Sequence, residues 1–317
     1  MKKSYVFMVC ACVFGCSCMA RADENSGLAV AIQNAKSACL GISDRMSNMK
    51  TMAGINTAVT GVGTVTGAVA LGAGVTKNKV DVVIEKWELA LDEMIQKQQN
   101  EGTTFYRIDL TNIEKSYNEK VKSVDAIQSD INKATEVSKN LGNIRTGTMA
   151  ASTVADTAGT LIALNNKVDD DLQVTIDNCI KSISALKTEH MRARVENTAS
   201  EQDLAYADKI VNSCLDWRDV DLSSIGKRAT GAAISSGAGA VMGLFGTITS
   251  AKANSDSVRN DNSDDGKQKE KSLNTTANVL AGGTTVASGV ATIFNATQIS
   301  AIKRAVAAAD KCEEALR

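Results

Sequence analysis

Residues 229–251 read ATGAAISSGAGAVMGLFGTITSA and contain no charged side chain. Within this stretch Gly231, Ser235, Gly239 and Gly243 recur every four residues. Small side chains at that spacing let two helix backbones approach closely. As a helix, the stretch is also long enough to cross the roughly 30 Å hydrocarbon layer of a membrane. It therefore predicts a helix that packs closely against a neighbour through its small residues.

Three other stretches share this composition of Gly, Ala, Thr, Ser and Val: residues 52–76, 146–166 and 273–301. Gly63 and Gly67 stand four residues apart in the first, and Gly289 lies in the last. The first two stretches resemble each other at the residue level, since residues 55–81 align with residues 144–169 with one gap. Self-similarity of this kind indicates an internal duplication.

The composition favours helices. Proline is absent from all 317 residues, and aromatic residues make up only 3% of the chain. Because proline interrupts helical hydrogen bonding, its absence predicts long helices. A core poor in aromatic residues suits helices pressed together through small side chains. The predicted fold is all-α: two related antiparallel helical hairpins with Gly/Ala-rich close-packed segments, the first with a coiled-coil tip.

Four cysteines occupy mirrored positions around the glycine-rich stretches. Cys39 precedes the first stretch and Cys179 follows the second, while Cys214 and Cys312 bracket the third and fourth. If each pair of stretches folds back on itself, Cys39 lies level with Cys179 and Cys214 level with Cys312. An even number of cysteines in an exported chain suggests disulfides, and the spacing favours these two pairs. Four buried free thiols are the alternative.

The repeat divides the chain into two modules, at residues 23–195 and 196–317. The tip of the first, about residues 80–141, carries apolar residues at helical and then coiled-coil spacing. The tip of the second, about residues 252–271, is rich in Asn, Ser, Asp and Gly. That composition predicts a disordered polar loop.

The N-terminus predicts export. Residues 1–22 combine Lys2 and Lys3, a short apolar stretch and a small-residue cleavage site at Ala20-Arg-Ala22. This is the layout of a secretory signal peptide. A small residue before Cys16 also gives a weaker match to a lipoprotein box. Removing the signal takes away three bases and no acid, so that 35 bases and 36 acids become 32 and 36. The resulting net charge of −4 argues against a nucleic-acid partner.

Motifs of catalysis and metal binding are weak. His190 is the single histidine, which excludes multi-histidine zinc sites, and its polar surroundings predict a solvated helix surface. No Cys-x-x-Cys pair occurs. Glycines at 61–67 and 237–243 match a loose dinucleotide fingerprint, but helix packing explains them more simply. We therefore expect no enzyme, no metal site and no cofactor.

Two functions remain open at this point. The first is a non-enzymatic, exported envelope protein that associates with membrane lipid or with itself through its glycine-rich helices. One form of it is a pore-forming-like protein whose hairpins insert after oligomerisation. Against constitutive spanning, the stretches are diluted by Gly, Thr and Ser, and Asp156 would be costly in lipid unless paired or facing water. The alternative is a soluble periplasmic or secreted module that presents its coiled-coil tip to a protein partner.

Overall fold

The computed structural model describes residues 27–101, 124–166, 168, 170–261 and 263–317. Within these residues the protein is helical, with no strand. The predicted signal peptide lies outside the described residues, as does the middle of the predicted coiled-coil tip. The repeated modules and the coiled-coil character of the tip therefore stay predictions.

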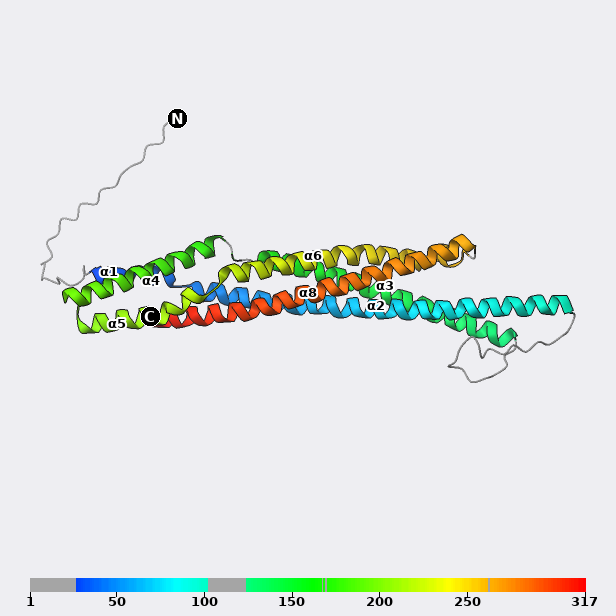
Figure 1. The fold of residues 1–317 in the computed structure, drawn as a ribbon, viewed down its shortest axis with the longest axis horizontal. Helices are drawn as coiled ribbons and strands as arrows, with labels where there is room; N and C mark the ends of the chain where they lie inside the picture. Colours follow the sequence, from blue (N-terminus) through cyan, green and yellow to red (C-terminus); the bar gives the residue numbers. More distant parts are fainter. Residues whose placement is uncertain (1–26, 102–123, 167, 169, 262) are drawn as a thin grey trace, which may run out of the picture. The chain divides into compact units, whose positions relative to one another are not determined.

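The helices are α1 (Gly27–Cys39), α2 (Ile42–Glu101), α3 (Val124–Asn165), α4 (Asp170–Glu196), α5 (Glu201–Cys214), α6 (Leu222–Ala253), α7 (Asp256–Arg259) and α8 (Asp264–Leu316), with a short 3-10 helix at Leu215–Asp219 (Figure 1). Their ends follow local chemistry. Gly41 has a φ of 88° between α1 and α2, a conformation that glycine adopts without strain. The side chains of Ser200 and Asp221 accept backbone N–H groups at the starts of α5 and α6.

The chain forms two compact units. The first comprises the described residues up to Ile42, together with Val174–Arg218 and Ala308–Arg317. The second comprises Ser43–Gln173 and Asp219–Ala307. Each unit draws segments from both of the sequence modules, because α4 belongs largely to the first unit and the long helices α2 and α8 contribute to both.

The first unit has a conventional apolar core and two disulfides. Cys39 pairs with Cys179 and Cys214 with Cys312, the pairs that the mirrored spacing predicts. Large buried side chains around them include Leu28, Ile176, Leu186 and Ile210. His190 is also buried, at 8% exposure, rather than on a solvated surface. It continues the α4 seam of Ile183 and Leu186, because the step of four residues keeps it on the same helix face.

In the second unit α2, α3, α6 and α8 pack against one another. Their buried positions recur at alternating steps of three and four, as on α6 at Ala232, Ser236, Gly239, Gly243, Gly246 and Ser250. A seven-residue repeat of this kind keeps one narrow stripe of each helix facing its neighbours. The helices thus meet through continuous seams along the glycine-rich stretches.

The polar segment 252–271 differs from its prediction as a disordered loop. It contains the end of α6, the short helix α7 and the first turns of α8. Val258 is buried, and Lys267 lies 3.6 Å from Glu88, so tertiary contacts support this turn. Hydrogen bonds from the Ser263 hydroxyl and backbone N–H hold the pKa of the exposed Asp261 carboxyl below its usual range. The composition alone did not show these contacts.

Candidate functional site

The four-helix bundle of the second unit has a reversed distribution of side chains. Along the glycine-rich stretches most buried positions are small or polar, and they include Asn56, Thr60, Ser152, Asp156, Ser236, Thr284, Ser288 and Asn295. Its exposed positions are large and apolar, and they include Val62, Val65, Val154, Leu161, Ile234, Val241, Phe245, Val286 and Ile293. Val154, for example, is 70% exposed while Asp156 is 0% exposed two residues later.

The reversal is confined to the glycine-rich stretches. Farther along α2 and α3 the buried cluster is Leu91, Ile127 and Ile131, with Ile84 and Trp87 packed against it. That is the ordinary arrangement of a water-soluble helix pair, with large apolar residues inside. The same chain therefore contains both patterns, and the change from one to the other occurs within single continuous helices.

Basic residues bound each of the uncharged stretches. Asp156 aside, the first charged residues met on leaving them are Lys50 and Lys77, Arg145 and Lys167, Arg228 and Lys252, and Lys271 and Lys303. All eight are basic, in a chain whose acids slightly outnumber its bases. Arg228 donates to the carbonyl of Thr297 (2.7 Å), which caps a backbone group at its end of the bundle. Long basic side chains commonly occupy the boundary between lipid and water.

The predicted glycine positions lie mostly at helix contacts. A methyl group added at Gly63 or Gly239 would lie 2.7 or 2.6 Å from an oxygen of Asp156, so the two glycines enclose that carboxyl. Gly67, Gly243 and Gly231 face Thr285, Thr153 and Phe294, respectively. Ser235 and Gly289 are half-buried at the margins, and the buried serine of that turn is Ser236.

Asp156 occupies the middle of the bundle. The Ser288 hydroxyl of α8 lies 2.8 and 2.7 Å from its two carboxyl oxygens. With Gly63 on α2 and Gly239 on α6 beside it, the carboxyl touches all three neighbouring helices. Sequence reasoning identified this residue as an obstacle to membrane insertion, but it did not identify Ser288 as its partner.

A connected set of polar side chains extends from this level toward the Met49 end of the bundle. Thr292 donates to Thr60 (3.1 Å), Asn295 donates to Thr60 (3.3 Å), and Asn56 donates to Asn295 (2.9 Å). Nearer the end, Asn166 donates to the carbonyl of Met49 (3.1 Å). The buried oxygens Asn56 Oδ1 and Ser236 Oγ have no hydrogen-bond partner. Both atoms approach Gly159, within 3.4 Å of where its Cβ would be.

An apolar layer separates Asp156 from the opposite end. Ala70, Met149 and Ala281 are buried there, with Leu71 and Leu280 packed against them. The two sides of Asp156 are thus chemically unequal along the bundle.

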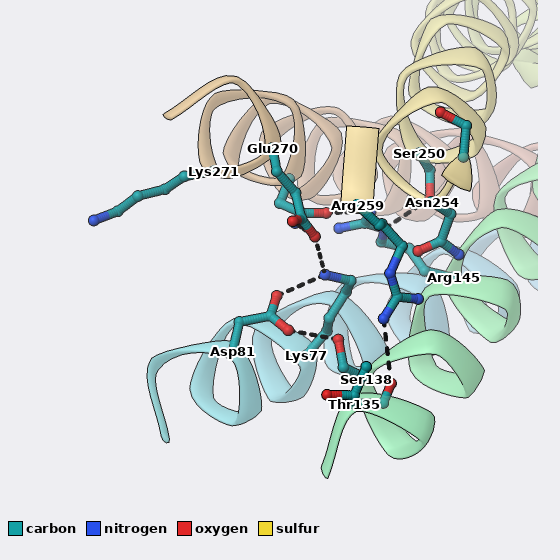
Figure 2. Close-up of polar contacts among 12 residues, drawn as sticks. Lys77, Asp81, Thr135, Ser138, Arg145, Ser250, Asn254, Arg259, Glu270 and Lys271 are labelled. Carbon is teal, nitrogen blue, oxygen red and sulfur yellow. Dashed lines mark hydrogen bonds and ion pairs between the residues drawn. The ribbon is translucent and has the colours of Figure 1, made fainter. Parts of the chain in front are cut away.

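Beyond the apolar layer lies a charged cluster (Figure 2). Arg145 is fully buried and donates to Ser250 (2.8 Å), Asn274 (2.7 Å) and Asn278 (3.2 Å). These three acceptors come from α6 and α8 and are all neutral. The fork of the guanidinium group allows one side chain to satisfy several acceptors at fixed angles.

Lys77 completes this cluster and is also fully buried. Its ammonium donates to Asp81 (2.6 Å) and Glu270 (3.2 Å), and Asp81 in turn accepts from Ser138 (Figure 2). With Arg145 nearby, two cations face two carboxylates, so the charges balance. Such an arrangement of complementary charges and hydrogen bonds fixes the register of the helices.

A separate pocket in the first unit is lined by residues of α4, α5 and the 3-10 helix, including Ile183, Lys187, Val211 and Trp217. Lys187 is its one ionisable lining residue, so it offers no acid–base pair. The sulfur atoms of Cys39, Cys179 and Cys312 lie within 4.8 Å of one another, but all three are in disulfides and cannot serve as thiolate ligands. No protein-family model, curated protein or solved structure matches this chain.

Proposed function

We propose that this protein is a non-enzymatic, exported component of the cell envelope whose four glycine-rich segments span a membrane as a helix bundle. The observation that carries the proposal is the reversal of the side chains in the second unit. In water, the hydrophobic effect favours burying Val, Ile, Leu and Phe and leaving Asp, Asn, Ser and Thr outside. In lipid this preference disappears, and helices associate through small residues and interhelical hydrogen bonds.

Three further features support a spanning bundle. Helices α2 and α8, and the α5–α6 segment, are long and apolar enough to cross a membrane. The stretch in α3 contains one charged residue, Asp156, and that residue faces the bundle interior, where a polar group in a membrane protein is tolerated. Of the flanking basic residues, Lys252, Lys271 and Lys303 are exposed and stand where lipid phosphates would meet the protein.

The finer architecture follows the duplicated plan. Each module contributes one antiparallel pair of glycine-rich helices, α2 with α3 and α6 with α8, and the two pairs complete the bundle. The disulfides require an oxidising compartment, so the cysteine-bearing helices belong on an exported side. The outward Val, Ile and Phe side chains also offer a surface for self-association within the membrane.

The test is partitioning of the mature protein. Cell membranes should retain it after alkaline carbonate extraction, and the purified protein should float with phosphatidylcholine vesicles in a density gradient. Quantitative release by carbonate together with failure to float would overturn the proposal. Leakage of dye-loaded vesicles distinguishes a pore former from a sealed bundle.

A second candidate, a soluble module that binds a protein through its helical tip, is favoured by the conventional core of Leu91, Ile127 and Ile131. This region has the packing expected of helices in water. Release into the soluble fraction as a monomer, with large outward apolar side chains protected by a partner protein, would support it instead.

A further inference from the structure

We infer that Asp156 is a proton-binding site in the bundle core, and that it exchanges its proton with the end of the bundle formed by Met49 and Asn166. The inference rests on the proposed membrane bundle and deepens it. The site is built from four helices: Asp156 on α3, Ser288 on α8, and Gly63 and Gly239, which press on the carboxyl from α2 and α6.

The carboxyl of Asp156 is fully buried, and burial without a countercharge favours its protonated form. The Ser288 hydroxyl carries one hydrogen, yet three oxygens lie near it: both carboxyl oxygens and the carbonyl of Thr284, at 2.9 Å. The neighbouring Ser152 hydroxyl donates to the carbonyl of Gly63 (2.9 Å). The Ser288 hydroxyl donates to the carboxyl, and because it carries one hydrogen it can satisfy one carboxyl oxygen at a time. The other oxygen is where the proton of the neutral acid would lie.

Countercharges are distant on every helix packed against Asp156. On α2, α6 and α8 the uncharged runs between Lys50 and Lys77, Arg228 and Lys252, and Lys271 and Lys303 contain no ionisable residue. On α3 itself the nearest charged residue is Arg145, 11 positions away. Eleven residues of helix span about 16 Å, which is too far for an ion pair. A proton is the counter-cation that fits the space, because the glycine contacts leave no room for a hydrated ion.

The proton reaches Asp156 from one end of the bundle, because the core is polar on that side of Asp156 and apolar on the other. Toward Met49 the polar side chains of Thr60, Asn295 and Asn56 form a connected series. The unpartnered oxygens of Asn56 and Ser236 lie in this region, and buried oxygens without a protein partner are the usual sites of internal water. Toward Arg145 the layer of Ala70, Met149 and Ala281 offers no side chain that carries a proton.

Infrared spectroscopy tests the protonation directly. We expect the mature protein in phosphatidylcholine vesicles at neutral pH to show the carbonyl band of a protonated, hydrogen-bonded carboxyl. The band should be absent from Asp156→Asn, which is nearly isosteric, and should shift in Ser288→Ala, which loses the hydroxyl that is hydrogen-bonded to the carboxyl. Raising the pH should convert it reversibly to carboxylate absorption. Circular dichroism confirms that each variant keeps its helix content.

Hydrogen–deuterium exchange of the same band tests the direction of access. Asn295→Leu, on the polar side, should slow exchange about tenfold by interrupting the hydrogen-bonded series. Met149→Leu, a matched substitution on the apolar side, should leave the rate unchanged.

Identical spectra from the wild type and Asp156→Asn would overturn the proton site, and slowing by Met149→Leu but not by Asn295→Leu would overturn the direction. Flotation of the same samples reports separately on the membrane proposal, so the two failures are distinguishable.

Discussion

Gly67 of α2 lies against the backbone of Thr285 of α8, so closely that a methyl group on Gly67 would sit 3.3 Å from both the Cα atom and the backbone nitrogen of Thr285. Side chains can turn away from a new neighbour, but backbone atoms in a helix cannot. The two helices can approach this closely because Gly67 has no side chain. The interhelical distance at this point therefore depends on glycine.

This contact predicts opposite effects for two glycine substitutions on one helix. Gly67→Ala should destabilise the bundle by about 1–3 kcal/mol, because it overpacks a backbone contact. Gly72→Ala, where the new methyl group meets nothing within 4 Å, should be neutral or stabilise by up to about 1 kcal/mol through helix propensity. Thermal unfolding followed by circular dichroism measures both. Equal effects would show that α2 and α8 do not meet at Gly67.

The outward apolar surface of the bundle predicts where an added charge would impair membrane integration. Val286 is 68% exposed and lies near the middle of the uncharged run of α8. Val286→Lys should reduce the membrane-integrated fraction, because a lysine at the centre of a spanning helix costs about 2.5–3.5 kcal/mol.

The control is Val137→Lys, at an exposed valine in the charged part of α3, which should have no effect. Carbonate extraction of cells that express each variant gives the comparison. In a water-soluble bundle, Val286→Lys would be as harmless as its control.

The buried ammonium of Lys77 predicts a loss of stability when it is removed. Lys77→Met removes the ammonium that Asp81 and Glu270 share and leaves Arg145 as the nearby cation. The side chains of the two acids are 31% and 25% exposed. Because water reaches these carboxylates, we expect a loss of about 1–3 kcal/mol rather than the full penalty of a buried unpaired charge. Lys79→Met, at an exposed position two residues farther along α2, is the control and should change the unfolding midpoint little.

The neighbouring sulfur atoms predict how the disulfides respond to a single substitution. Non-reducing peptide mapping should recover Cys39–Cys179 and Cys214–Cys312 from the wild type. Cys214→Ser frees Cys312, whose sulfur lies within 4.8 Å of both sulfurs of the other pair. A free thiolate at that distance can attack a disulfide, so peptides that link Cys312 to Cys39 or Cys179 should appear.

The double variant Cys214→Ser/Cys312→Ser provides the comparison and should retain Cys39–Cys179 alone. Recovery of a Cys39–Cys214 link from the wild type would contradict the structure.

The sequence by itself determined the helical class and the cysteine partners. The absence of proline and the helical spacing of apolar residues predict long helices. The mirrored positions of Cys39 and Cys179 place them level once the chain folds back. These features depend on composition and on spacing along the chain, both of which a single sequence displays.

Only the tertiary structure decided what the glycine-rich helices enclose. Asp156 and Ser288 are 132 positions apart, and no local pattern pairs them. The polar segment 252–271 became helical through contacts such as Lys267 with Glu88, which its composition did not indicate. The reversal of polar and apolar faces needed four helices to be placed together, because each seam alone contains small residues that suit either water or lipid. Which side chains face inward is a property of the assembled bundle. Because Asp156 faces inward, it can serve as the proposed proton-binding site and does not oppose membrane insertion.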